Sequence, residues 1–212
     1  VASGSELLLN SSNSYDSMIV DDKFIQEYIK APLQSIIEYY PQEISGIESS
    51  LNEFFAKNNC LGMNLPKVFL HHEFNPWNIL AENNGNLILL DFEDSKSLGL
   101  PLLDLYNYFL ISYRIAFVGE TMESNARSFD EKSKRACIVL KVYNDFSKKY
   151  CEKFNISELL KDFLFIVYTI DAITFFISDK RKEINYAKSW LPMLKALSVS
   201  NCFENFINKE ID

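Results

Sequence analysis

The stretch from Val68 to Asp91 constrains the fold of this chain more than any other part of its sequence. It predicts an apolar strand, a polar loop, a short apolar strand, an Asn-Gly turn and a further apolar strand that ends on a carboxylate. Asn-Gly between two apolar runs is a strong short-range signal for a β-hairpin. The loop carries His71, Glu73 and Asn78, so local structure alone is expected to bring two carboxylates and an amide together.

Such a group of oxygen atoms suits a phosphoryl-transfer site. Mg²⁺ binds hard oxygen ligands in near-octahedral geometry, and a carboxylate accepts the proton of a hydroxyl that attacks a phosphate. The spacing His71-x-Glu73-x-x-x-x-Asn78 equals that of a kinase catalytic loop, H-x-D-x-x-x-x-N, with Glu in place of Asp. Taken alone, the segment also fits an ordinary hairpin with a purely structural role.

Three motifs in order resemble those of the aminoglycoside phosphotransferase and choline kinase family. His71–Leu80 resembles its H-G-D-F-x-P-x-N-I-L signature, Leu89–Asp94 its I-D-F-E-D/Y segment, and Gly99–Leu105 the G-x-P-x-x-D-L that follows. An ordered series is far more specific than one short pattern. The resemblance implies a protein-kinase-like fold and an enzyme that transfers phosphate from ATP, with Mg²⁺, to the hydroxyl of a sugar, an aminocyclitol or an amino-alcohol.

The catalytic and metal-binding roles follow from this resemblance. It implies that Glu73 and His71 are catalytic, with Glu73 as the carboxylate that accepts the proton of the acceptor hydroxyl. It gives the Mg²⁺ to the side-chain carbonyl of Asn78 and the carboxylate of Asp91. The partners that it implies are a small-molecule acceptor and a nucleotide-binding lobe.

Five further residues receive supporting or substrate-binding roles. The resemblance implies that Asp104 bonds the backbone of the catalytic loop, and Pro76 stiffens that loop because proline fixes φ. We expect Asp171, Trp77 and Glu93 in the substrate pocket. Asp171 interrupts a strongly apolar helix, where a carboxylate needs a partner or a wet cavity, so a structural anchor or an exposed helix edge is the alternative. Trp77 has an alternative role as a cover for the hairpin.

Two positions depart from the family signature. Glu73 is one methylene longer than Asp, and a misplacement of about 1 Å can cost on the order of a hundredfold in rate. His72 replaces a Gly and removes backbone freedom. These departures support an alternative function, a catalytically weak or inactive pseudokinase-type binding or adaptor module. A third interpretation is a helical interaction domain in which the motifs are accidental.

The stretch before the catalytic loop does not resemble a nucleotide-covering lobe. A kinase of this type needs a small sheet, a strand Lys and a Glu to pair with it, whereas residues 1–70 predict a polar leader and two helices. The six glycines are spread along the chain, so no Gly-rich phosphate loop is present in the sequence. We expect residues 1–20 to be a flexible leader or linker remnant. Residues 21–212 are expected to be the C-terminal lobe of a longer protein, or a natural protein that lost its other lobe.

The expected fold class is α+β, mostly helical, with a small β-hairpin that carries the catalytic loop on a helical bundle. Hydrophobic periodicity and start signals place the helices. Their expected ranges are 22–40 with a kink at Pro32, 44–57, 102–118, 130–154, 157–177, 179–197 and 200–209, with a loop over 119–130.

Charge and composition limit the classes of partner. The formal charge of −8 argues against general nucleic-acid binding, which usually relies on a basic patch. The longest apolar run, Phe163–Ile177, is shorter than the roughly 20 residues of a membrane span and contains Asp171. The four cysteines form no metal-binding pattern, and isolated cysteines without a signal peptide fit a reducing cytoplasm.

Overall fold

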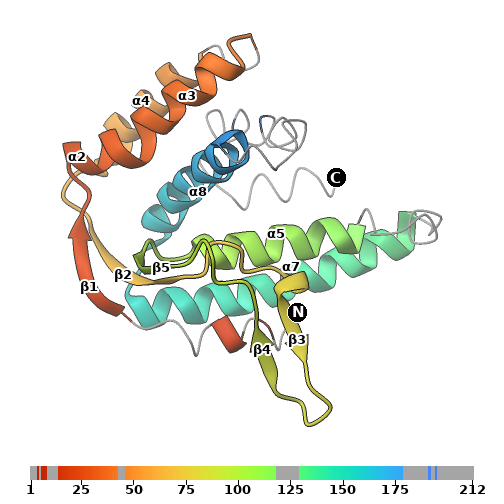
Figure 1. Cartoon of the computed structure of the whole chain (residues 1–212). Coiled ribbons are helices and arrows are strands. Elements are labelled where there is room, and N and C mark those ends of the chain that lie inside the picture. The colour runs from red at the N-terminus through yellow and green to blue at the C-terminus, as the bar shows by residue number, and fades with distance from the viewer. Residues whose placement is uncertain are drawn as a thin grey trace. The chain divides into compact units, whose positions relative to one another are not determined.

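The computed structural model describes residues 4, 6–8, 14–42, 46–117, 129–178, 191 and 194 of the 212. These residues are mostly helical and include two small β-sheets, which confirms the α+β class (Figure 1). The chain divides into two compact units. The first unit comprises Val1–Ser17 and Pro66–Ile156, and the second comprises Met18–Leu65 and Ser157–Asp212.

The second unit begins with one long helical stretch. It consists of α2 (Asp22–Ile25), the π-helical turn η1 (Gln26–Lys30) and α3 (Ala31–Tyr39). Asp21 caps its start, because the Asp21 carboxylate accepts a hydrogen bond of 2.7 Å from the N–H of Phe24. The predicted helix over 22–40 is therefore confirmed. The π-helical turn ends at Lys30, two residues before Pro32, which has no N–H to donate to the preceding turn.

Two more helices complete the described part of the second unit. They are α4 (Ile47–Asn58) and α8 (Glu158–Ser178), and α8 packs against α3 and η1. The ring of Phe163 on α8 lies 5.8 Å from the rings of both Phe24 and Phe55, centroid to centroid. Helix α4 begins later than the predicted Ile44, because Gly46 before it has a left-handed φ of 88°. Residues 43–45 lie outside the described residues.

Most residues of a three-stranded sheet belong to the first unit. Its strands are β1 (Ser14–Ile19), β2 (Asn64–Leu70) and β5 (Lys96–Gly99), in the order β1-β2-β5. Residues 14–19 fall inside the predicted leader, yet they form β1, and the Asp16 carboxylate lies 3.5 Å from the Lys67 Nζ on β2. Pairing with β2 makes this polar segment a strand, which local propensity does not indicate. The division into leader and lobe stays a prediction.

The predicted hairpin is confirmed. Strand β3 (Ile79–Ala81) pairs antiparallel with β4 (Leu87–Leu89), and the pair projects from the helices of the first unit (Figure 1). The turn between them closes with a hydrogen bond of 2.8 Å from the N–H of Glu82 to the carbonyl of Asn86. Gly85 occupies the left-handed position of this turn with a φ of 87°, where glycine meets no steric cost.

Helices α5 (Leu103–Phe117) and α7 (Phe129–Phe154) form the rest of the first unit and run side by side. Phe109 and Tyr143 join them, edge to face, with ring centroids 5.2 Å apart. The helices predicted over 102–118, 130–154 and 157–177 are confirmed to within a residue or two. The helices predicted over 179–197 and 200–209, and most of the loop over 119–130, lie outside the described residues.

Candidate functional site

The candidate site is the loop that joins β2 to the hairpin in the first unit. Residues 71–78 form this loop, and the last three of them, Pro76–Asn78, are the short 3-10 helix η2. His71 and Phe74 are fully buried, whereas Glu73 and Asn78 are half-buried. The loop is therefore anchored by its apolar and aromatic members and presents its polar ones toward the surface.

Asp104 holds the start of the loop. Its carboxylate accepts a hydrogen bond of 2.7 Å from the backbone N–H of His71 and one of 2.8 Å from that of His72. The Asp104 side chain is buried, at the N-terminal end of α5, where the helix dipole favours a negative charge. Two bonds to an ionised acceptor in a buried position are strong, so the third motif of the chain fixes the first.

His71 joins the loop to the segment that ends at Asp91. Its Nε2 lies 2.8 Å from the carbonyl oxygen of Leu90. Because a carbonyl only accepts, Nε2 carries the proton. The ring meets that of Phe92 edge-on, 4.9 Å between centroids. Burial lowers the pKa of His71, while the Leu90 carbonyl and the nearby Asp91 and Glu73 carboxylates act in the opposite direction. The structure thus favours a neutral imidazole.

Asn75 organises the second half of the loop. Its Oδ1 accepts hydrogen bonds from the N–H groups of Trp77, at 3.0 Å, and Asn78, at 3.2 Å. Its Nδ2 donates to the carbonyl of Glu73 at 2.9 Å. Sequence reasoning missed this residue, although an Asn directly before a Pro is a known turn initiator. Asn107 on α5 was also missed, and its Nδ2 donates to the carbonyl of Phe74 at 3.2 Å.

The side-chain amide of Asn78 is oriented by a neighbouring carbonyl. Its Nδ2 donates to the carbonyl of Glu73 at 3.0 Å, so Oδ1 is the atom that Asn78 can offer to a cation. The backbone carbonyl of Asn78 accepts a bond of 2.8 Å from the N–H of Leu90. Asn78 and the residue directly before Asp91 are therefore neighbours across the hairpin.

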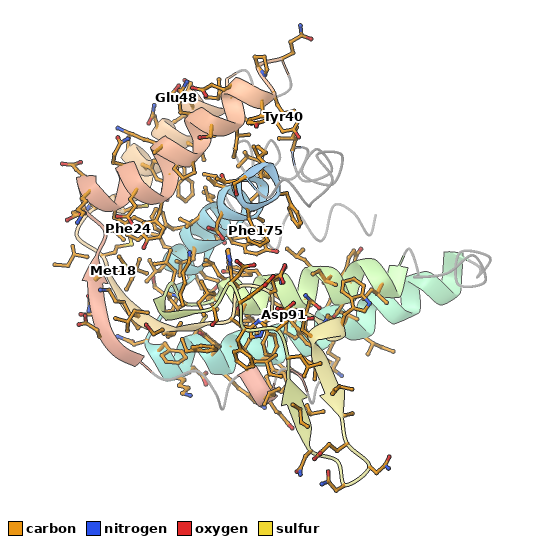
Figure 2. All side chains as sticks on the ribbon, viewed as in Figure 1. Met18, Phe24, Tyr40, Glu48, Asp91 and Phe175 are labelled. Atoms are coloured by element: carbon orange, nitrogen blue, oxygen red, sulfur yellow. The ribbon has the colours of Figure 1, made fainter. Side chains whose placement is uncertain are left out.

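Asp91 follows the hairpin in a left-handed conformation and is labelled in Figure 2. Its φ is 61° and its side chain is exposed. Among the described residues, no group of three or more His, Cys, Asp or Glu side chains could hold a metal ion. Mg²⁺ does not need such a group, because it usually binds one or two carboxylates together with waters and substrate phosphates. The hard oxygen atoms of Asn78 and Asp91 fit that requirement.

The three predicted pocket residues lie on different elements. Trp77 in η2 is 59% exposed, and Glu93 is an exposed residue of the second motif, Leu89–Asp94. Asp171 is half-buried on α8, in the second unit. Burial raises the pKa of the Tyr28 hydroxyl, and the carboxylates of Glu27 and Asp171 raise it further. A substrate-binding role for Asp171, Trp77 and Glu93 stays a prediction.

Comparison with known protein families shows to which family the chain belongs. A model of the phosphotransferase enzyme family (APH) matches residues 26–136, just over half of the 212 residues. The matched range contains all three motifs and the residues that Asp104 and His71 join. No curated protein and no solved structure matches the chain. In the described residues, no helix combines the length and apolar character that a membrane span requires. The chain belongs to the phosphotransferase enzyme family.

Proposed function

We propose that this chain carries the metal-binding and acceptor-binding part of an ATP-dependent phosphotransferase that acts on a small-molecule hydroxyl. The acceptor would be a sugar, an aminocyclitol or an amino-alcohol. Membership of the family implies phosphotransferase activity in general. One observation carries the finer proposal: the buried Asp104 carboxylate accepts the backbone N–H groups of both His71 and His72. These two hydrogen bonds connect the third motif to the first, next to Glu73.

Each polar side chain of the loop then has a task. The Glu73 carboxylate accepts the proton of the acceptor hydroxyl as its oxygen attacks the terminal phosphate of ATP. Asn78 would offer Oδ1 and Asp91 its carboxylate to Mg²⁺. Mg²⁺, when bound, supplies positive charge that balances the phosphate oxygens. The hydrogen bonds from Asn75 and Asn78 to the Glu73 carbonyl fix the backbone from which the Glu73 carboxylate extends.

We assign His71 a positioning role in place of the catalytic role that the resemblance implied. Its side chain is fully buried, and its Nε2 proton is used in the bond to the Leu90 carbonyl. A neutral, enclosed ring is poorly suited to exchange protons with a substrate. It is well suited to fix the distance between the catalytic loop and Asp91.

The remaining parts of the proposal concern partners. A nucleotide-covering lobe would bind most of the ATP, and we propose that it lies outside this sequence. A cytoplasmic location stays a prediction. Cys60 is a buried free thiol, as is usual in a reducing compartment.

A second candidate function is supported by the loop itself. Glu73 stands where a kinase loop has Asp, and the neighbouring His72 is a non-glycine residue with a left-handed φ of 72°. Both features alter the position of the proton acceptor. A binding or adaptor module with weak or no transfer would keep the architecture and lose turnover.

An activity assay with matched variants tests the proposal. ADP release is measured on the full-length parent protein, which includes the nucleotide-covering lobe, with Mg-ATP and a panel of sugars, aminocyclitols and amino-alcohols. Mg-ATP binding to the same protein is measured by thermal shift. Asp91→Ala should lower turnover by roughly a hundredfold or more, since a catalytic metal supplies several kcal/mol. Asp145→Ala, which removes an exposed carboxylate on α7, should change nothing. Equal turnover in the wild type and Asp91→Ala would remove Asp91 from the mechanism, and stabilisation by Mg-ATP without turnover would support the binding module.

A further inference from the structure

The N-terminal segment of the first unit packs onto α5. Its described residues, 4 and 6–8, are helical. Gly4 and Leu8 lie about one turn apart and share a face of this helical segment, and both are buried, whereas Glu6 is exposed. Both buried residues fall inside the predicted leader, for which the sequence indicates no contact. We therefore asked what the buried face touches.

Gly4 lies directly against the side chain of Tyr108 on α5. A Cβ at residue 4 would clash with the hydroxyl oxygen and with ring carbons of Tyr108. Glycine is the residue that lets a backbone approach a neighbour this closely, so any side chain at position 4 would push the two apart. Tyr108 is 4% exposed, and burial raises the pKa of its hydroxyl to about 12. The Tyr108 hydroxyl therefore ends under the N-terminal segment and away from water.

Tyr108 connects this segment to the catalytic loop. The rings of Tyr108 and Phe74 meet edge to face, with their centroids 5.4 Å apart. Phe74 directly follows Glu73 and is fully buried. The side-chain amide of Asn107, next to Tyr108 on α5, donates a hydrogen bond of 3.2 Å to the Phe74 carbonyl. Because protein interiors are close-packed, a shift of the Tyr108 ring must move Phe74, and with it the residue beside Glu73.

We propose that the N-terminal segment, residues 4 and 6–8, is a strap behind the catalytic loop, and that it makes Tyr108 a positioning residue for Glu73 through Phe74. With the strap docked, the Tyr108 ring is enclosed and keeps Phe74 in one place. With the strap displaced, the Tyr108 side chain has space to move, and the loop loosens at residues 73 and 74. The catalytic meaning of Glu73 rests on the proposed phosphotransfer, whereas the link between strap and loop does not.

The first experiment compares two alanine substitutions in the strap by amide hydrogen exchange of the full-length parent protein. Gly4→Ala introduces the clash with Tyr108, so exchange at the amides of residues 73–75 should become about fivefold faster. Alanine favours a helix more than glycine does, so helix propensity acts against this result and cannot cause it. Glu6→Ala changes an exposed position of the same segment and is the matched control, which should leave these amides unchanged. Faster exchange in Gly4→Ala that is confined to the strap would overturn the inference.

A double-mutant cycle tests whether the effect passes through Tyr108. Tyr108→Phe removes the hydroxyl oxygen, which is the atom nearest to a Cβ at residue 4, and keeps a ring against Phe74. In this background, Gly4→Ala should speed exchange at residues 73–75 by a factor that is at least about twofold smaller than in the wild type. Equal effects of Gly4→Ala in both backgrounds would overturn the path through Tyr108.

Leu8→Ala covers the case in which Gly4→Ala does not fold. It removes a buried side chain of the strap about one turn from Gly4 and introduces no clash. Weaker docking of the strap should again speed exchange at residues 73–75. Unchanged exchange there, together with faster exchange at residues 6–8, would overturn the inference.

Turnover separates positioning from a purely structural role. In the full-length parent protein, Gly4→Ala should lower kcat about tenfold, because small displacements of a catalytic group are costly, and should leave the KM for Mg-ATP unchanged. A lower melting temperature with wild-type kcat would refute the positioning role. If the wild type shows no turnover with any acceptor, the proposed function fails, and the hydrogen-exchange results still decide whether the strap and the loop are linked.

Discussion

The neutral state of His71 leads to a prediction about stability and pH. His71→Phe keeps an aromatic ring of similar size in the buried position but deletes the Nε2–H group that bonds the Leu90 carbonyl at 2.8 Å. The ring contacts with Phe74 and Phe92, at 6.2 and 4.9 Å between centroids, can persist. The loss is then one hydrogen bond and one unsatisfied, partly buried carbonyl, about 1–2 kcal/mol at neutral pH.

The pH dependence of stability distinguishes the loss of this hydrogen bond from a general loss of packing. The pKa of His71 is lowered in the folded state, chiefly by burial, so the unfolded state binds the proton more readily. The contribution of neutral His71 to the free energy of unfolding is then fully present above the ordinary histidine pKa of about 6.5. It is lost as the pH decreases from there toward the pKa of His71 in the folded state. For one proton the slope cannot exceed about 1.4 kcal/mol per pH unit.

Urea unfolding at pH 7.5 and pH 5.5 measures both the loss of stability at neutral pH and its dependence on pH. The wild type should lose more stability between these pH values than His71→Phe, because the variant lacks the buried imidazole at position 71. The chain has one other histidine, His72, which is half-exposed, so the comparison is repeated in a His72→Asn background, where His71 is the one histidine of the sequence. An equal loss of stability in the wild type and His71→Phe would refute the assignment of a neutral, buried His71.

Three further variants or reactions test separate parts of the structure. Gly99→Ala would place a Cβ in steric clash with the Leu70 Cβ, so it should cost about 1–3 kcal/mol in urea unfolding by forcing β5 from β2. Asn75→Ala removes the acceptor of two backbone N–H groups, which should cost about 1 kcal/mol and weaken Mg-ATP binding in a thermal-shift assay. Iodoacetamide at pH 8 should label the exposed Cys137 and spare Cys60, whose pKa burial raises to about 11, until urea is added.

The hairpin and the helices were predictable because their signals are local. Asn84-Gly85 between apolar runs defines a turn whatever surrounds it, and the 3.6-residue periodicity of α4, α5, α7 and α8 is contained in each segment. The strands β1 and β5 were missed because they are short and polar. They become strands only when β2 lies between them, which is a long-range contact that no window of sequence shows.

The sequence indicates a set of candidate site residues, whose roles stay a prediction, but it does not indicate the hydrogen-bond network around them. The motif spacing indicates Glu73, Asn78 and Asp91, but it does not show that Asn75 bonds the Glu73 carbonyl or that His71 is fully enclosed. Both depend on the path of the loop after His72. Left-handed φ values at non-glycine residues are held by tertiary contacts, and sequence patterns do not indicate them.

The bonds that assemble this site are made largely by the backbone, and this explains how the chain keeps the architecture while it departs from the motif. Asp104 binds N–H groups, and His71 and Asn78 bind carbonyl groups, so none of these bonds depends on the side chains at positions 72 and 73. Glu73 and His72 can therefore replace Asp and Gly without loss of the loop. It follows that an intact loop is not by itself proof of turnover. The Asp91→Ala assay decides between catalysis and binding, because the role proposed for Asp91 is to hold Mg²⁺ through its carboxylate.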